Sequence, residues 1–207
     1  AAAALPAQLM PAPSAEKKVL DLCAAPGGKT AQLVAAGHDV TALDIASTRL
    51  KILSENLRRL ELTATVIEAD LLKWETDQRY DAILLDAPCT ATGTIRRHPD
   101  IPILKSAADI TRQSDMQTRF LDRAPELLRD GGTLVYSVCS MEKLEGLDQI
   151  EKLLDRNSDI SVEPIKPTET PGFENCVNPD GWLQTTPAHL SNKGGVDGFF
   201  IARLRKK

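Results

Sequence analysis

Two cysteines of this chain stand at the ends of apolar runs and are candidates for nucleophilic chemistry. Cys89 follows the largely apolar run at 83–88, and Cys139 follows the run at 134–138. Each is followed by polar, loop-like sequence that a substrate can reach, whereas apolar residues usually surround a structural thiol on both sides. The pattern therefore indicates two thiols in one cleft. The alternative is that each cysteine is only a small apolar side chain at a strand end.

A glycine turn at residues 23–30 is a second candidate for chemistry. It follows the apolar run at 19–22 and precedes a stretch of helical spacing that stops at Gly37. Such a turn lets the backbone approach a ligand, and the N-terminus of the next helix favours negative charge. The chain contains neither G-x-G-x-x-G nor G-x-x-x-x-G-K-[ST] at this turn. A ligand with a pyrophosphate or triphosphate is therefore disfavoured.

Two aspartates at the ends of later apolar runs point to the chemistry of that ligand. Asp44 lies about twenty residues past the turn, where a carboxylate accepts hydrogen bonds from a ribose diol. Asp70 follows the next run, where it can meet an adenine edge. S-adenosylmethionine, a nucleoside without a long phosphate tail, fits this arrangement. The alternative is that both aspartates only cap the turns that follow their strands.

The elements that must position these residues alternate between strand and helix. Strands are predicted at 19–22, 40–45, 65–69, 80–85 and 133–138. Leucine spacing predicts helices over 50–60 and 144–154, and another spans 107–128 with a kink near Pro125. Residues 89–104 are expected to form a functional loop, and 164–181 an irregular excursion. This order predicts an α/β fold with a doubly wound, mostly parallel sheet and an antiparallel C-terminal edge from 182–185 and 198–204.

In such a sheet, ligands bind beyond the carboxyl ends of the strands. Polar or reactive residues occupy six predicted positions there, namely Cys23, Asp44, Asp70, Asp86, Cys89 and Cys139. Chance packing does not readily explain six such residues on one rim.

Length and composition limit the class of protein. With 207 residues and 42% apolar side chains, the chain is expected to form a single domain over 1–207. Residues 1–17, rich in Ala and Pro and without an initiator Met, are expected to be an irregular remnant of a longer protein. Four cysteines without a C-x-x-C pair favour a reducing compartment and no metal site. We therefore expect a cytoplasmic monomer without a membrane span.

The charge of the chain argues against binding a polyanion through bulk electrostatics. The formal net charge is −4, so contact with a nucleic acid would need a local patch or a missing domain. The obvious patch is 96–98, which reads Arg-Arg-His. The basic tail, formed by Arg203, Arg205, Lys206 and Lys207, is more often a solvated surface feature.

From residue 19 onward the sequence resembles the RNA cytosine-C5 methyltransferases, and within them the bacterial small-subunit ribosomal RNA enzymes of the Sun/Fmu type. The resemblance lies in four ordered motifs, at 21–30 (DLCAAPGGKT), 86–93 (DAPCTATG), 96–101 (RRHPDI) and 197–200 (DGFF). It implies a Rossmann-like class I methyltransferase fold. It also implies methyl transfer from S-adenosylmethionine to C5 of a cytidine in RNA, with 16S ribosomal RNA as the expected partner.

The resemblance assigns roles to individual residues. It implies that the cofactor is bound by Cys23, Ala24, Ala25, Pro26, Gly27, Gly28, Lys29, Asp44, Asp70 and Asp86, with Arg49 framing the pocket. Cys139 matches the nucleophile, and Cys89 matches the cysteine that helps to release the product. Lys29 and Asp86 match residues that approach the target base. Cys176 receives no role.

The chain also departs from the family pattern. Val138 precedes the nucleophile where Thr is usual, and residues 143–146 replace most of a Pro-Glu-Glu-Asn segment. Both changes bear on the local order around Cys139. The helical RNA-binding domain that the ribosomal enzymes carry upstream is missing. We therefore expect a missing N-terminal domain to supply most of the RNA affinity.

The expected chemistry explains why these groups are needed. Cytosine C5 is a weak nucleophile, so a thiolate first adds to C6 and pushes electron density onto C5. Lys29 can lower the pKa of the attacking thiol, and Asp86 can bind N3 and N4 of the base. The base must leave its stack, and we predict that it lies over Pro88.

Two other functions remain open from the sequence. A methyltransferase for amino groups would retain the cofactor, but the chain lacks the aromatic residue of the D/N-P-P-Y motif and such transfer needs no thiol. A non-catalytic scaffold for ribosome assembly would have no use for Cys89, Cys139, Lys29 or Asp86.

Overall fold

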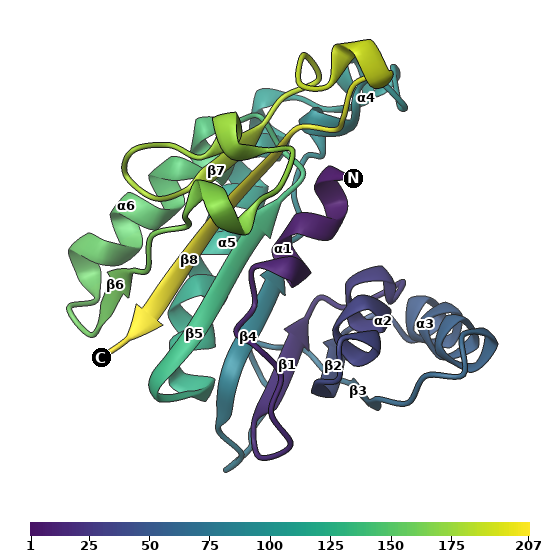
Figure 1. The fold of residues 1–207 in the computed structure, drawn as a ribbon, viewed down its shortest axis with the longest axis vertical. Coiled ribbons are helices and arrows are strands. Elements are labelled where there is room, and N and C mark those ends of the chain that lie inside the picture. Colours follow the sequence, from purple (N-terminus) through teal and green to yellow (C-terminus); the bar gives the residue numbers. More distant parts are fainter.

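The computed structural model describes residues 1–207, and one eight-stranded sheet forms its centre (Figure 1). The strands are β1 (Lys18–Leu22), β2 (Asp39–Asp44), β3 (Thr65–Glu68), β4 (Tyr80–Asp86), β5 (Leu128–Val138), β6 (Ile160–Val162), β7 (Leu183–Thr185) and β8 (Phe199–Lys206). Their order is β3-β2-β1-β4-β5-β8-β6, with β7 also paired to β8. The first five strands are parallel, and β8 is antiparallel to its neighbours. The predicted fold class is confirmed.

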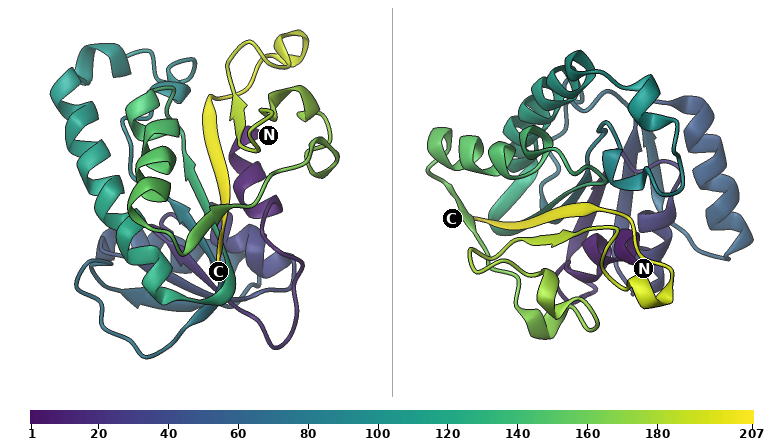
Figure 2. Two further views of the ribbon diagram at one scale, coloured as in Figure 1. Left: turned by 90° about the vertical axis from the view of Figure 1, so that its left-hand side faces the viewer. Right: turned by 90° about the horizontal axis from the view of Figure 1, so that it is seen from above.

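Helices cover both faces of the sheet (Figure 2). They are α1 (Leu5–Gln8), α2 (Gly28–Ala35), α3 (Ser47–Arg59), α4 (Ile101–Leu104), α5 (Ala107–Leu127) and α6 (Leu147–Arg156). One face packs against α5 and α6, and the other against α1, α2 and the excursion at 164–181. The leucine-rich face of α3 packs beside the turn that follows β1. None of these helices is both long and apolar enough to cross a lipid bilayer.

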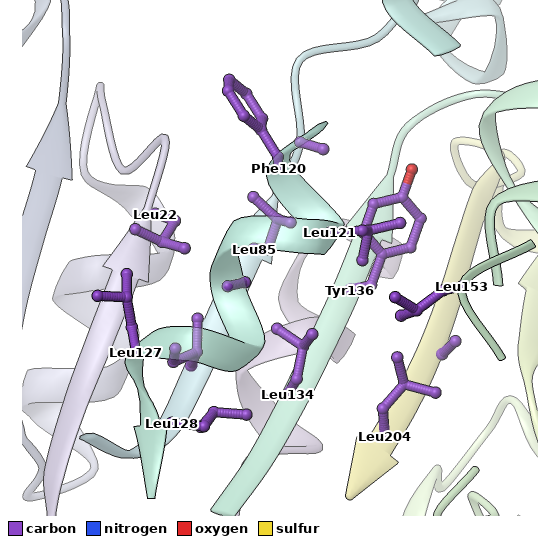
Figure 3. Packing of buried hydrophobic residues seen from close by; sticks show 14 of the residues in the cluster. Leu22, Leu85, Phe120, Leu121, Leu127, Leu128, Leu134, Tyr136, Leu153 and Leu204 are labelled. Atoms are coloured by element: carbon purple, nitrogen blue, oxygen red, sulfur yellow. The ribbon is translucent and has the colours of Figure 1, made fainter. Parts of the chain in front are cut away.

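The central strands are buried on both faces, which is typical of a parallel sheet between helices. On β4, Ile83 and Leu85 pack toward α5 and α6, whereas Ala82 and Leu84 pack toward α1 and α2. Figure 3 shows Leu85 near the side chains of α5. Because β1, β4 and β5 run parallel, their carboxyl ends meet at one edge of the sheet.

The N-terminal segment is more ordered than the sequence predicts. Residues 2–8 form a 3-10 turn followed by α1, and Leu5 and Leu9 are buried in the layer that covers β1 and β4. Alanine is the strongest helix former, and Pro6 stands in the first helical turn, where its missing N–H costs nothing. The expectation of an irregular segment over 1–17 is therefore wrong for residues 2–8.

Other differences from the predicted elements are local. Strand β6, of three residues, was not predicted. Strand β5 begins at Leu128, since an irregularity in its pairing with β4 accommodates the glycines at 131 and 132. The loop at 89–104 contains a 3-10 turn at Thr92–Thr94 and the short helix α4. Each difference lies outside the strand ends that carry the candidate site.

Candidate active site

The glycine turn between β1 and α2 is held by contacts from β2 and α3. Gly27 adopts a φ of 94°, and a Cβ at this position would lie 2.7 Å from Leu53 Cγ on α3. Asp44, at the end of β2, accepts hydrogen bonds from the amides of Ala25 and Ala46 at 3.1 and 2.9 Å. Arg49 of α3 donates to the carbonyl oxygen of Ala25. The turn therefore needs glycine at 27, and Asp44 and Arg49 fix its shape.

Two cavities that share Cys23 lie along this edge of the sheet. The first, of about 440 Å³, includes Asp44, Arg49, Asp70 and Pro88 in its wall. The second, of about 380 Å³, is lined by Asp21, Ala24, Ala25, Pro26, Gly28, Lys29 and Asp86 together with N-terminal alanines. Every residue expected to bind the cofactor lines one of the two cavities, except Gly27. Gly27 contributes through the conformation of the turn.

Lys29 and Asp86 form an ion pair beside the second cavity. Lys29 Nζ lies 2.7 Å from Asp86 Oδ2, and the hydroxyl of Ser137 donates to Asp86 Oδ1 at 2.7 Å. The same ammonium group lies 5.5 Å from the centroid of the Phe199 ring. The side chain of Lys29 is 14% exposed and that of Asp86 33%, so both can meet a ligand that enters the cavity.

The structure brings the two predicted cysteines together. Cys89 follows β4 and Cys139 follows β5, and their sulfur atoms lie 3.4 Å apart. Both residues are partly buried, and neither lines the two cavities described above. Parallel pairing of β4 with β5 places Asp86 opposite Ser137, so the two strands end at the same level of the sheet.

The electrostatic surroundings of the two thiols shift their pKa values in opposite directions. The pKa of Cys139 is lowered mainly because its thiolate accepts a hydrogen bond from Cys89, and Lys29 adds to the effect. The pKa of Cys89 is raised because it donates that hydrogen bond and because it is buried. At neutral pH, Cys139 is therefore the thiol that ionises more readily, while Cys89 retains its proton.

The remaining two cysteines differ from this pair. Burial raises the pKa of Cys23, which lies at the junction of the two cavities, so its side chain stays a neutral thiol. Cys176 is buried in the apolar layer that also contains α1. Its pKa is raised by burial as well.

The loops that carry the cysteines pack closely against the start of β8. The amide of Gly93 donates to the carbonyl of Cys139 at 3.0 Å. The amide of Gly198 donates to the carbonyl of Gly93 at 2.7 Å. A Cβ on Gly93 would lie 2.1 Å from the Gly198 oxygen. This close approach explains why glycines occupy two of the sequence motifs.

The basic patch at 96–98 is partly neutralised. Both Arg96 and Arg97 form ion pairs with Asp197, at 3.3 and 2.8 Å. Arg97 remains half exposed and His98 is exposed, so the patch still faces solvent. The ion pairs join the loop after β4 to the loop before β8.

The basic tail does not take part in the site. It lies on β8, which is antiparallel to β5, so Arg205 pairs opposite Thr133 while Phe200 pairs opposite Val138. The tail is therefore at the far end of the sheet from Cys139. Arg203 is buried against Glu169, and Lys206 donates to the carbonyls of Pro125 and Leu128.

Two fully buried carboxylates near the site were not predicted as functional residues. Asp21 lies on β1 and lines the second cavity; Thr30 donates to its Oδ2 at 2.6 Å, but its Oδ1 has no partner. Burial raises the pKa of Asp21 to about 7. Glu145 lies just before α6. A charged residue inside the apolar run at 19–22 was the available signal for Asp21, whereas Glu145 lies in the segment 143–146, which was noted only as a departure from the family pattern.

Comparison with known proteins finds matches over nearly the whole chain. The family model of 16S rRNA methyltransferases RsmB/F matches residues 8–205. The ribosomal RNA small subunit methyltransferase B of Salmonella paratyphi B is 43% identical over 201 residues, which cover 95% of this chain and 44% of the relative. The chain thus spans less than half the length of this relative.

Solved structures agree in fold. NSun6 from Pyrococcus horikoshii, determined with SFG, an analogue of S-adenosylmethionine, has a TM-score of 0.80 and 28% identity over 98% of this chain and 51% of its own. A methyltransferase homologue from the same organism has a TM-score of 0.76 and 33% identity over 98% of this chain and 65% of its own. Because the family model covers nearly the whole chain, the chain belongs to the RsmB/F family of 16S rRNA methyltransferases.

Proposed function

We propose that this chain transfers a methyl group from S-adenosylmethionine to C5 of a cytidine in small-subunit ribosomal RNA, through a transient bond between Cys139 and C6. The observation that carries the proposal is the thiol pair. Two sulfurs lie 3.4 Å apart at the ends of adjacent strands, and their pKa values are shifted in opposite directions. Transfer to an amino group would need neither thiol.

The cavities fit the cofactor. Asp21 Oδ1 is buried without a partner in the wall of the second cavity, where the α-ammonium group of a methionine moiety would supply the missing donor. Both oxygens of Asp44 accept an amide, yet each retains a lone pair for a ribose hydroxyl. Asp70, which lines the first cavity together with Asp44, can accept a hydrogen bond from the adenine amino group. When bound, S-adenosylmethionine supplies an electrophilic methyl group on a sulfonium.

The residues of the chain divide the remaining work. The Cys139 thiolate adds to C6 of the flipped base, and the electron pair of the C5–C6 double bond moves toward C5. In this proposal the Lys29–Asp86 pair, which lies close enough to Cys139 to affect its pKa, hydrogen-bonds N3 and the N4 amino group, which stabilises the added charge. After C5 is methylated, its proton passes to solvent, the electron pair of the C5–H bond re-forms the C5–C6 double bond, and the S–C6 bond breaks with the Cys139 sulfur leaving as a thiolate. Cys89, which holds its proton at neutral pH, assists this exit by donating a hydrogen bond to the departing sulfur.

RNA recognition is the part of the proposal that relies on residues outside the chain. The net charge of the chain is −4, and the chain spans 44% of the length of the curated relative. We propose that the rest of the longer protein supplies most of the RNA affinity. A reaction on ribosomal RNA fits a cytoplasmic location.

The test uses RNA that contains 5-fluorocytidine, in which loss of the C5 substituent is blocked and the adduct persists. We expect the protein to form a covalent adduct with this RNA and Cys139→Ala to form none. With ordinary RNA we expect Cys89→Ala to accumulate the adduct, because release is slowed. The adducts are measured by intact-mass spectrometry.

Two results would overturn the proposal. One is an adduct that forms on Cys139→Ala but is lost from Cys89→Ala, which would exchange the two roles. The other is a digest of the methylated RNA in which the methyl group is on an amino nitrogen instead of C5.

A further inference from the structure

A buried carboxylate on the loop that carries Cys139 also contacts the loop that carries Cys89. Glu145 precedes α6 and is 0% exposed. A carboxylate without water is costly unless several donors surround it. Its position therefore depends on the donors that the two loops supply.

The donors come from the residue that follows each cysteine. Thr90, next to Cys89, donates its amide and its hydroxyl to Glu145 at 2.9 and 2.5 Å. Ser140, next to Cys139, donates its hydroxyl to the same carboxylate at 2.5 Å. One side chain thus joins the loop after β4 to the loop after β5.

Glu145 is itself held from two other elements. Gln117 of α5 donates to Glu145 Oε1 at 3.2 Å, and the hydroxyl of Tyr136 on β5 donates to the Glu145 carbonyl at 2.6 Å. Both partners are fully buried. The carboxylate is therefore a fixed point to which the two loops are attached.

We propose that Glu145 is a positioning residue, which sets the separation of the Cys89 and Cys139 sulfurs by accepting hydrogen bonds from Thr90 and Ser140. The consequence for the reaction rests on the proposed function: the loops stay joined through Gly93 and Thr92, but without Glu145 the residues next to the two sulfurs can shift, and Cys89 no longer hydrogen-bonds the Cys139 sulfur. Since that hydrogen bond is the main cause of both pKa shifts, the ionisation of the thiols would change with it.

The negative charge of Glu145 adds a second effect. Besides the hydrogen bond to Cys139 and burial, the carboxylate raises the pKa of Cys89. Glu145 thus helps to keep the proton on the thiol that is proposed to assist release. The effect needs a carboxylate at this distance and would not follow from a neutral residue of the same size.

The separation of the sulfurs can be measured without RNA or cofactor. Phenylarsine oxide condenses with two neighbouring thiols, forming two As–S bonds and releasing one water, and it binds a single thiol far more weakly. A second tethered bond typically strengthens binding by about 10²- to 10⁴-fold. We would titrate the protein with phenylarsine oxide and read the product by intact mass, with Cys89→Ala as the single-thiol reference.

We expect Glu145→Ala to lose at least about tenfold in phenylarsine oxide affinity, toward the value of Cys89→Ala. Glu145→Gln, which retains one acceptor oxygen, should recover part of the loss. The matched control is Gln149→Ala. Gln149 is also fully buried and hydrogen-bonds Ser114 and the Leu144 carbonyl, but it does not contact Thr90 or Ser140. This control should retain wild-type affinity.

Wild-type affinity in folded Glu145→Ala would overturn the inference, and so would an equal loss in Gln149→Ala. If Glu145→Ala does not fold, Thr90→Val decides by the same criterion, because it removes the hydroxyl that the loop after β4 donates to Glu145. The titration is independent of the reaction. A wild-type protein that forms no adduct with 5-fluorocytidine RNA would contradict the proposed function and leave the titration result standing.

Discussion

At the scale of single residues, the number of donors around each carboxylate decides what it can still bind. Asp44 caps the turn after β2 and also accepts the amide of Ala25. Capping and ligand binding were alternatives from the sequence, but a carboxylate offers about four acceptor positions and only two are taken here. Asp21 is the opposite case, because one of its oxygens has no donor at all.

The orphaned oxygen of Asp21 predicts a pH dependence of stability. Its pKa in the folded protein is about 7, above the ordinary value of 3.8, so folding takes up a proton between these values. The free energy of unfolding should therefore fall as the pH rises from about 4 to 7, by up to roughly 4 kcal/mol at about 1.36 kcal/mol per pH unit. Above pH 7 the full penalty is present.

We expect Asp21→Asn to remove this slope and to be more stable than the wild type at pH 8. Urea denaturation at several pH values measures it. Asp155→Asn, at an exposed position on α6, is the control and should retain the wild-type slope. Equal pH slopes for the wild type and Asp21→Asn would contradict the assignment to Asp21.

At the scale of elements, periodicity predicts the strands well because those of the sheet's centre are buried on both faces. The run at 80–85 has an apolar residue at almost every position, and it forms β4. Helix α1 escaped prediction because an Ala- and Pro-rich segment resembles a linker until α2 and β4 offer it a surface.

Predicted strand ends were enough to place Cys89, Cys139 and Asp86 at one edge. They were not enough to identify Glu145, since its partner Thr90 lies on the loop after β4, whereas Glu145 and Ser140 lie on the loop after β5. A long-range contact between loops leaves no period in the sequence. The same holds for the ion pairs of Arg96 and Arg97 with Asp197.

The close approach of two loops at Gly93 predicts a large effect of a single methyl group. In Gly93→Ala the added Cβ would meet the Gly198 oxygen at 2.1 Å and the Cys139 oxygen at 2.9 Å, and both atoms belong to backbone. Overpacking of this kind typically costs about 1–3 kcal/mol, and here it also disturbs the Cys139 loop.

Urea denaturation compares Gly93→Ala with Gly28→Ala, where nothing lies within 4 Å of the added Cβ. The control lies in the first turn of α2 and should be neutral or slightly stabilising. Equal stability of Gly93→Ala and the wild type would show that the loops are free to separate.

At the scale of the whole molecule, the N-terminal segment belongs to the site as well as to the core. Leu5 and Leu9 pack in the layer over β4, and the side chain of Gln32 on α2 donates to the carbonyl of Ala4 at 2.9 Å. Ala1, Ala3 and Ala4 form part of the wall of the second cavity, next to Lys29. The start of the chain thus helps to shape the space that we assign to the methionine portion of the cofactor.

The charge distribution of the molecule predicts weak RNA binding by the chain alone. Lys29 is paired with Asp86, and both arginines of the patch at 96–98 are paired with Asp197, so few cations near the thiols are free to meet a phosphate. Each phosphate neutralised on a single strand contributes about −0.7 to the slope of log K against log salt. Fluorescence anisotropy with a ribosomal RNA fragment should therefore give a shallow slope, of magnitude below about 2, for residues 1–207.

A full-length relative should bind more tightly and with a steeper slope, because its additional segment would carry most of the phosphate contacts. The same affinity and slope for both proteins would instead locate RNA binding within this chain, with the exposed side of the 96–98 patch as the first place to look.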